Sequence, residues 1–224
     1  MEKDCVKILY ADRRILVCVK PFGVLSTDEP GGLPEIVRGL LAEADASVRT
    51  VHRLDRVAGG VTVLARSREA ARRLGGSVQD RAFGKEYLAV VEGTPPERGT
   101  MRDLLARDRQ TRRTFVTDTP GKDVREAALD YRTLGSAQGY SLVHIRLHTG
   151  RTHQIRAQFS SRRFPLAGDR KYGGQPIRDN EIALWSYALS FPHPQTEQTV
   201  RFSCPPPDTF PWDLFEVDRI VTTA

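Results

Sequence analysis

Apolar residues recur along the chain with two different spacings, and each spacing predicts a different kind of element. Short runs of β-branched and aromatic residues predict strands. These runs span residues 6–10, 15–19, 61–65, 84–93, 127–134, 140–148, 182–191 and 199–202. Apolar positions on one helical face predict helices over residues 33–44, 68–81 and 153–162. Because these elements mix without strict strand–helix–strand alternation, the sequence predicts an α+β fold.

Polar residues, glycine and proline separate these elements. Residues 11–14 join the first two strand runs as a hairpin. Ser67 is the expected N-cap of the second helix, which Gly75 and Gly76 could shorten. Another hairpin is expected across residues 135–139. Residues 94–122 carry few apolar side chains, so we expect an excursion there, a small basic subdomain.

Positive charge is concentrated in two segments of the chain. Residues 98–125 contain eight Arg or Lys and four Asp, and residues 151–172 contain six Arg or Lys and one Asp. Together these segments carry a net charge of +9, whereas the whole chain carries +6. Concentrated basic segments favour a polyanionic partner such as nucleic acid, although a solvated charged face would give the same pattern.

The composition is that of an ordinary globular protein, with 39% hydrophobic and 28% charged residues in a chain of 224. No apolar run is long enough to span a membrane, and the charged first residues do not resemble a signal peptide. The three cysteines lack metal-ligand spacing and favour a reducing compartment. We therefore expect a cytoplasmic monomer that does not bind membranes, with one domain over residues 1–224.

Asp55 is the strongest candidate for chemistry. Gly59 and Gly60 break the chain just before the buried run 61–65, so Asp55 is expected on a loop that leads into a core strand. His52, Arg53 and Arg56 surround it with hydrogen-bond donors. A carboxylate held by cations is available as a nucleophile or base. On this pattern alone, an Asp that only fixes a turn is the more common case.

Four motifs then follow one another in the chain. They are His52-Arg53-Leu54-Asp55, the strand run 85–93, Thr-Gly-Arg-Thr-His-Gln-Ile-Arg at 149–156, and Gly-Asp-Arg-Lys-Tyr-Gly at 168–173. In this order and spacing they resemble the RluA-like family of RNA pseudouridine synthases. The resemblance implies a single pseudouridine-synthase-type catalytic domain with a mixed, mostly antiparallel sheet, flanking helices and a central cleft. Because the chain begins at the first strand of that domain, we expect no N-terminal accessory RNA-binding domain.

The resemblance also implies a reaction, the isomerisation of uridine in RNA. The base is cut from its sugar, turned and rejoined through a ring carbon, without a metal or cofactor. Asp55 matches the family's catalytic Asp, Tyr87 the Tyr that stacks on the base, and Arg151 the basic residue that pairs with the Asp. Taken alone, Tyr87 would more often be a core residue and Arg151 could simply cap a turn.

Other side chains of the motifs and basic segments are expected to hold RNA. These are His52, Arg53, Arg56, Arg112, Arg113, His153, Arg156 and Lys171. His153 and Arg156 could instead hold the Asp55 loop, and Arg112 and Arg113 could belong only to a solvated face. Arg53 could fill the space that a flipped uridine leaves, because a guanidinium plane stacks on bases. The substrate is expected to be structured RNA, ribosomal RNA ahead of transfer RNA. The alternatives are an RNA-binding module of the same fold without catalysis, and a glycosidase, which the lack of a paired carboxyl motif disfavours.

Overall fold

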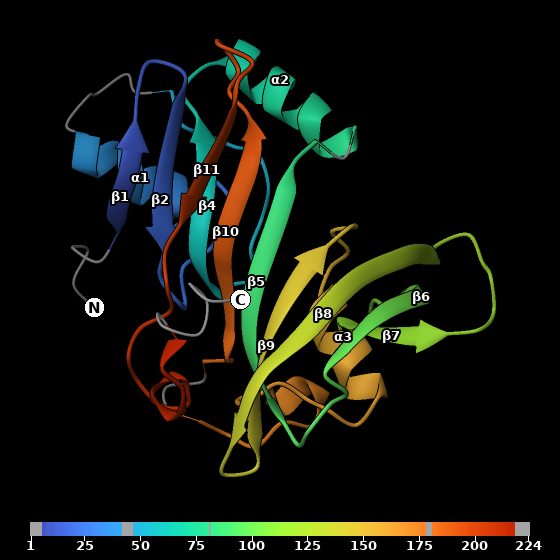
Figure 1. Ribbon diagram of the computed structural model, residues 1–224. Coiled ribbons are helices and arrows are strands. Elements are labelled where there is room, and N and C mark those ends of the chain that lie inside the picture. Colours follow the sequence, from blue (N-terminus) through green and yellow to red (C-terminus); the bar gives the residue numbers. More distant parts are fainter. Residues whose placement is uncertain (1–5, 42–46, 81, 178–180, 218–224) are drawn as a thin grey trace. The chain divides into compact units, whose positions relative to one another are not determined.

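The computed structural model describes residues 6–41, 47–80, 82–177 and 181–217 (Figure 1). Contacts divide the chain into two compact units. Unit 1 consists of residues 1–85 and 185–204, and unit 2 of residues 86–184 and 205–224. Among the described residues, no helix combines the length and apolarity needed to cross a membrane.

Unit 1 is built on a sheet in the order β1-β2-β4-β10, with β11 on β10 and β3 on β4. The strands are β1 (Lys7–Ala11), β2 (Ile15–Lys20), β3 (Arg49–Thr50), β4 (Gly59–Ala65), β10 (Leu184–Pro192) and β11 (Thr199–Ser203). Only the β4–β10 pair among these described pairings is parallel, which makes the sheet mixed and mostly antiparallel. The residues of β2 and β4 are all buried, as their apolar runs predict.

Two helices cover the core of unit 1. α1 (Leu33–Leu41) packs Leu33 and Val37 against Leu16 and Leu64, and residues 42–44 of the predicted helix lie outside the described residues. α2 (Arg68–Gln79) has Ser67 as its N-cap, and Ser67 Oγ accepts a 3.1 Å hydrogen bond from the amide of Ala70. α2 runs through both of its glycines, so they do not shorten it; position 81 lies outside the described residues.

Gly59 and Gly60 belong to β4 itself, which corrects the prediction that they precede the strand. They lie opposite Trp185 and Ser186 of β10. A Cβ at Gly59 would come within 2.5 Å of the Trp185 ring, and one at Gly60 within 2.4 Å of the Ser186 carbonyl oxygen. The glycines therefore permit the close approach of two neighbouring strands.

Unit 2 contains a second run of strands in the order β5-β9-β8-β6-β7. The strands are β5 (Gly84–Glu92), β6 (Arg98–Asp108), β7 (Arg113–Thr117), β8 (Arg125–Ala137) and β9 (Tyr140–Leu147). The helical elements are α3 (Gln154–Ser161) and the short 3₁₀ turns η2 (Arg170–Tyr172) and η4 (Trp212–Leu214). The β7–β6, β6–β8 and β8–β9 pairs are antiparallel, and the predicted α+β class is confirmed.

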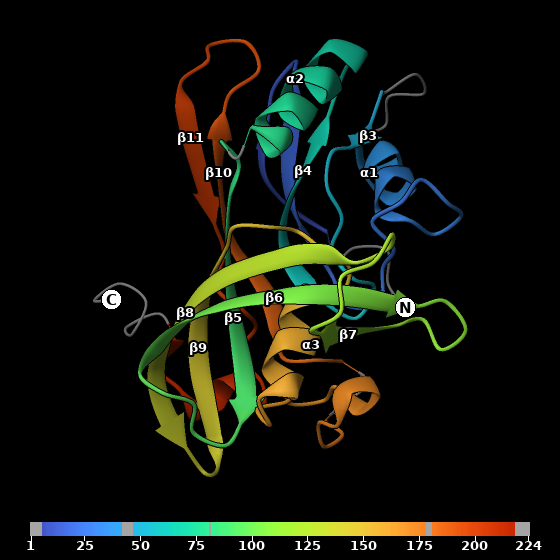
Figure 2. The ribbon, with the colours of Figure 1, turned by 90° about the vertical axis from the view of Figure 1, so that its right-hand side faces the viewer.

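The basic segment 94–122 is not an excursion, which corrects the prediction. It forms the antiparallel strands β6 and β7, and α3 packs beside β7 (Figure 2). Met101, Leu105 and Thr114 are buried, while many of the intervening positions carry exposed arginines. The alternation that marks a half-buried strand is present, but frequent charged side chains lower the apolar content on which the prediction relied.

The hairpin expected across residues 135–139 is tighter than predicted. β8 continues to Ala137, with an irregular register between Thr133 and Gly135 that indicates a β-bulge. The turn consists of Gln138 and Gly139, whose φ angles are 52° and 82°. Positive φ at both central positions is typical of the two-residue turns that suit twisted hairpins.

Candidate active site

The loop that carries Asp55 is fixed to unit 1 on both sides of the carboxylate. Before it, the amide of Leu54 donates to Ser26 Oγ, and Ser26 Oγ donates to the Leu54 carbonyl, both at 3.0 Å. After it, the amide of Gly23 donates to the Arg56 carbonyl at 2.8 Å, and Arg56 Nε donates to the Gly23 carbonyl at 2.9 Å. The structure thus holds Asp55, which is partly exposed, between two anchored neighbours.

Lys20 also supports the Asp55 loop. Its side chain is fully buried, and Nζ donates hydrogen bonds of 2.8 Å to the carbonyls of Pro21 and Val24 and a longer one of 3.5 Å to that of Arg56. Burial lowers the pKa of Lys20 to about 8, and the charge of Asp55 opposes this shift. A buried cation therefore acts electrostatically on the candidate catalytic carboxylate.

His52 has an internal position in unit 1. The side chain is buried, and Nε2 accepts a 3.3 Å hydrogen bond from the amide of Val63 and lies 3.3 Å from Thr62 Oγ1. Burial, together with the charge of Lys85, lowers the pKa of His52 to about 3, so the ring is neutral at pH 7. These contacts join the start of the Asp55 loop to β4, and the predicted RNA-binding role of this buried residue stays a prediction.

Arg53 and Arg56 are exposed, as an RNA contact requires. Arg53 lines a cavity of about 620 Å³ together with Arg49 and the ion pair between Arg38 and Asp28. Arg56 uses Nε for the Gly23 carbonyl, which leaves the rest of its guanidinium at the surface beside Asp55 in sequence. Both residues are thus available to RNA, and their binding roles stay predictions.

Tyr87 and Arg151 lie in unit 2, whereas Asp55 lies in unit 1, and the predicted meeting of these three side chains stays a prediction. Tyr87 is on β5 with 7% of its surface exposed. Arg151 is exposed in the turn before α3, where its Nε donates a 2.9 Å hydrogen bond to the Glu126 carbonyl. This bond fixes the inner part of the arginine and leaves its outer part at the surface.

Gln154 organises the turn that presents Arg151. Its Oε1 accepts hydrogen bonds from the amide of Arg151 at 3.0 Å and from Thr149 Oγ1 at 2.8 Å, while Nε2 donates to the Ala128 carbonyl at 3.1 Å. Gln154 is 3% exposed, so these bonds form away from water. The Thr-Gly-Arg-Thr-His-Gln motif therefore positions its arginine through a buried amide.

The third and fourth motifs are joined inside unit 2. Arg156 forms a buried, two-pronged ion pair with Asp169, at 2.6 Å from Nε and 2.9 Å from the second nitrogen. His153, which has a φ of 55°, lies with Nδ1 2.9 Å from Tyr172 Oη. Arg156 is 5% exposed and His153 is partly exposed, and the predicted RNA contacts of both residues stay predictions.

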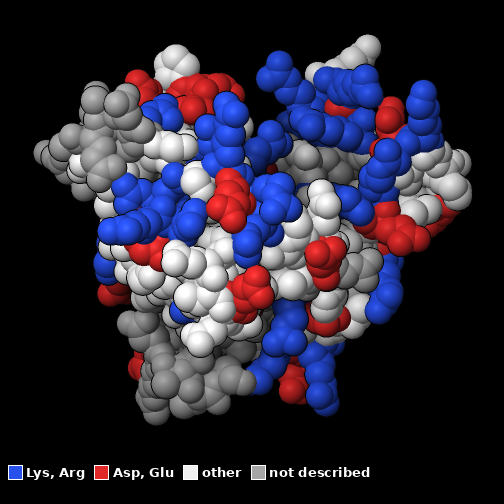
Figure 3. Space-filling view, turned by 90° about the horizontal axis from the view of Figure 1, so that it is seen from above, with Lys and Arg blue, Asp and Glu red and all other residues white. Residues whose placement is uncertain are grey.

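Lys171 and the tip of the β6–β7 hairpin form a basic cluster, consisting of Arg107, Arg112, Arg113 and Lys171. Lys171 Nζ donates a 2.8 Å hydrogen bond to the Arg112 carbonyl. Burial, with the charges of Arg156 and of the three arginines of the basic cluster, lowers the pKa of Lys171. Within the described part of the chain, none of the four members has an ion pair. Lysine and arginine side chains also gather on the face shown in Figure 3.

Sequence reasoning missed three supporting residues, Lys20, Gln154 and Asp169. Each carries a polar group that is buried and hydrogen-bonded within the described residues. Lys20 precedes a Pro-Phe-Gly turn, and Gln154 and Asp169 lie inside quoted motifs, so motif membership was the available signal. Among the described residues, no group of three or more His, Cys, Asp or Glu side chains could hold a metal ion.

Comparisons with known proteins agree with this reading. A family model described as RNA pseudouridylate synthase matches residues 14–161. The uncharacterized RNA pseudouridine synthase YlyB of Bacillus subtilis is 34% identical over 212 residues, which cover 90% of this chain and 69% of that protein. Ribosomal large subunit pseudouridine synthase D of Neisseria meningitidis is 31% identical over 238 residues, which cover 98% of this chain and 63% of that protein.

The fold is also found among solved structures. Human RNA Pseudouridylate Synthase Domain Containing 1 is similar with a TM-score of 0.81 at 23% identity, over 100% of this chain and 96% of that one. At this identity the likeness shows the fold alone. The sequence matches show the family: this chain belongs to the RluA-like family of RNA pseudouridine synthases, which are isomerases.

Proposed function

We propose that this protein isomerises specific uridines in structured RNA, with ribosomal RNA as the first candidate and transfer RNA as the second. The observation that carries the proposal is the Asp55 loop, which Ser26, Gly23 and Lys20 hold in place. The ribosomal preference is supported by the names of two relatives, the large-subunit synthases D of Neisseria meningitidis and Haemophilus influenzae. We propose a cytoplasmic monomer of one catalytic domain, with no metal or cofactor.

The proposed reaction breaks one bond to the sugar and forms another. The glycosidic bond between N1 and C1′ of uridine breaks, the uracil turns, and C5 bonds to C1′. The proton on C5 leaves and N1 gains a proton, so the product is an isomer of the substrate. Asp55 acts on the sugar, by attack on C1′ or by removal of a sugar proton, and stabilises an oxocarbenium-like transition state.

One carboxylate is sufficient for this leaving group. Most glycosidases need a second carboxyl group as an acid, because an alkoxide leaves poorly. The uracil anion is delocalised and needs less protonation. Lys20 supplies a positive charge near Asp55. We propose Arg151 as a second cation, and an ion pair at about 4 Å is worth about 4 kcal/mol at an effective dielectric near 20, before desolvation takes back a share.

The freed uracil has to stay bound while it turns. We propose Tyr87 as an aromatic wall that holds the face of the base without fixing its angle in the plane. A uridine inside a duplex is out of reach, so the enzyme has to flip it out. Arg53, which is exposed, is proposed to fill the vacated space, and Arg56, Arg112, Arg113, His153 and Lys171 to contact the RNA.

The substrate can be identified by pseudouridine mapping across the RNA of cells with and without this gene. We expect a small set of sites, in ribosomal RNA, to disappear with the gene and to return when it is restored. Restoration with Asp55→Asn should leave them absent, whereas restoration with Asp208→Asn, an exposed aspartate of unit 2, should return them. Identical maps in all strains would leave an RNA-binding module without catalysis as the better account.

A further inference from the structure

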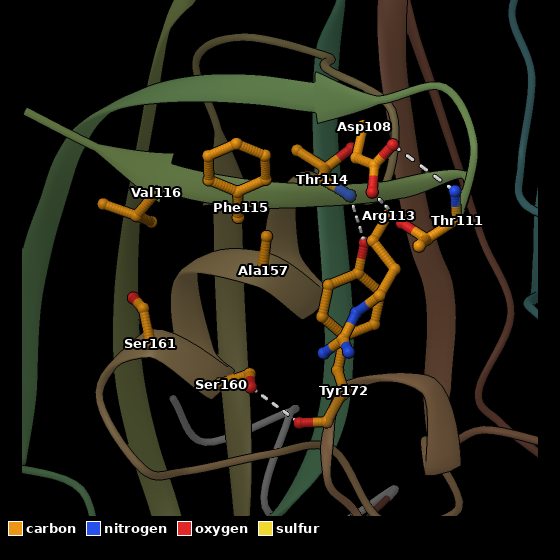
Figure 4. Close-up of a pocket in the computed structure, with 10 residues that line it drawn as sticks. All are labelled: Asp108, Thr111, Arg113, Thr114, Phe115, Val116, Ala157, Ser160, Ser161 and Tyr172. Carbon is orange, nitrogen blue, oxygen red and sulfur yellow. Dashed lines mark hydrogen bonds between the residues drawn. The ribbon is translucent and has the colours of Figure 1, made fainter. Parts of the chain in front are cut away.

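A cavity of about 420 Å³ lies in unit 2 between β7 and α3 (Figure 4). Arg113, Phe115 and Val116 line it from β7, and Ala157 and Ser160 line it from α3. Its volume falls in the range of small-molecule sites, about 300–1,000 Å³. None of the proposed catalytic residues lines this cavity, so the mechanism above leaves it unused.

The apolar part of the wall suits the flat face of a nucleobase. The Phe115 side chain is 49% exposed, and it lines the cavity together with Val116 and Ala157. Tyr172 closes another side of the cavity, with the Arg113 guanidinium 5.3 Å from its ring centroid. Aromatic faces and guanidinium planes are the surfaces on which unpaired bases stack.

The polar part of the wall is ordered by hydrogen bonds within unit 2. Ser160 Oγ donates to the Tyr172 carbonyl at 2.6 Å, and the amide of Thr114 donates to Tyr172 Oη at 2.8 Å. Asp108 accepts a 2.6 Å hydrogen bond from Thr111 Oγ1 and holds the hairpin turn. The Ser160 hydroxyl and the Asp108 carboxylate can accept further hydrogen bonds, and the Arg113 guanidinium can donate them. The cavity can therefore bind both the donors and the acceptors on the edge of a base.

The mouth of the cavity carries positive charge. Arg113 belongs both to the cavity wall and to the basic cluster. Lys171 directly precedes Tyr172 in the chain and donates to the Arg112 carbonyl. Arg112 has a φ of 53°, in the left-handed region that residues with a side chain rarely adopt. The cations of the basic cluster, which have no ion pair with a described residue, can bind a phosphate, and the aromatic side chains beside them can stack on the base attached to it.

We propose that this cavity binds one unpaired nucleotide of the RNA substrate, with the base on Phe115 and its phosphate on Arg112, Arg113 and Lys171. The identity of the ligand as RNA rests on the proposed function, whereas the site does not depend on catalysis. Such a contact recognises the RNA at a nucleotide other than the one that is isomerised. The cavity therefore contributes to the choice of target site.

The test uses the full chain with Asp55→Asn, so that binding is measured without turnover. The probe is a structured ribosomal RNA fragment with a fluorescent 2-aminopurine in a loop. Phe115→Leu should weaken binding by about 5-fold to 100-fold, as expected for one stacked base, and reduce the quenching of the probe. Phe210→Leu, which alters an aromatic of 44% exposure in the same unit, should change neither. Equal binding by both variants would overturn the proposal.

Salt dependence separates the phosphate contact from the base contact. Arg113→Gln should lower the slope of log affinity against log salt by about 1, whereas Phe115→Leu should leave the slope unchanged. Arg146→Gln, at an exposed position outside both basic segments, is the control.

If adenosine monophosphate requires Phe115 for binding but RNA does not, the assignment of the ligand as RNA is wrong. If wild type binds RNA through Phe115 but forms no pseudouridine, the proposed activity fails and this site stands.

Discussion

Lys20 and Asp55 interact electrostatically inside unit 1, and the lysine is the buried partner. Lys20 Nζ donates to the carbonyls of Pro21, Val24 and Arg56, so it also ties β2 to the loop of the carboxylate. An ammonium group without water is costly unless its hydrogen bonds and a nearby negative charge compensate. Lys20 therefore combines support of the loop with a positive potential at Asp55.

This position of Lys20 predicts a particular pH dependence of stability. Burial lowers its pKa from 10.5 to about 8 in the folded chain. Between these pH values the unfolded chain keeps a proton that the folded chain has released, so the contribution of Lys20 to the free energy of unfolding rises with pH, by about 1.4 kcal/mol per unit. Denaturant titrations from pH 7 to 10.5 should show this rise in wild type relative to Lys20→Met. Parallel curves would contradict the buried ammonium.

His52 predicts a pH dependence of stability in the acid range. Its folded pKa is lowered from 6.5 to about 3, mainly by burial. As the pH falls from 6.5 toward 3, the unfolded chain binds a proton that the folded chain refuses, so stability is lost at about 1.4 kcal/mol per pH unit. His52→Gln keeps an acceptor for the Val63 amide and should lack this loss. Urea unfolding at pH 4 to 7 measures both proteins, and equal slopes would remove His52 as the cause.

The Arg156–Asp169 pair predicts a large cost for breaking it. Both side chains are buried, so Asp169→Asn leaves a guanidinium without its charged partner and should lower the free energy of unfolding by about 3–5 kcal/mol. The matched control is Asp123→Asn, which removes the exposed partner of Arg109 and should cost about 0–1 kcal/mol. Chemical denaturation gives the free energy of unfolding of both variants. A loss below about 1 kcal/mol for Asp169→Asn would mean that water reaches the Arg156–Asp169 pair.

Two substitutions at Tyr87 distinguish a role in base stacking from a role in proton transfer. Tyr87→Leu removes the aromatic face and should lower kcat/KM by about 5-fold to 100-fold, the worth of one stacked base. Tyr87→Phe keeps the face, so it should retain the RNA affinity of wild type. A fall in kcat for Tyr87→Phe would assign the hydroxyl to proton transfer. Steady-state kinetics of both variants make the comparison, and full activity of Tyr87→Leu would remove the residue from the site.

The elements that the sequence predicted well are those with continuous apolar runs or a clear capping residue. The runs at 15–19 and 61–65 are buried strands, and the Ser67 cap starts α2 as its side chain suggested. The strands of 94–122 were missed because arginines occupy their exposed positions. The alternation of buried and exposed positions is present there, but the low apolar content hid it.

The candidate site shows a similar division. A motif in the sequence identified the Asp55 loop, but not that His52 and Arg156 point inward, because a motif does not say which of its side chains is buried. Lys20 and Gln154 each donate one hydrogen bond to a carbonyl that is far away in sequence, that of Arg56 and that of Ala128. Such partners follow from tertiary packing, which local pattern does not encode.

The central claim is that Asp55 carries the chemistry, and tritium release tests it most directly. The hydrogen on C5 of uridine is lost when C5 bonds to the sugar, so RNA labelled with tritium at that position releases the label on isomerisation. Wild type and Asp208→Asn should release the label at equal rates, whereas Asp55→Asn should release none and bind the same RNA within a few-fold of wild type. Release by Asp55→Asn at the wild-type rate would contradict the account.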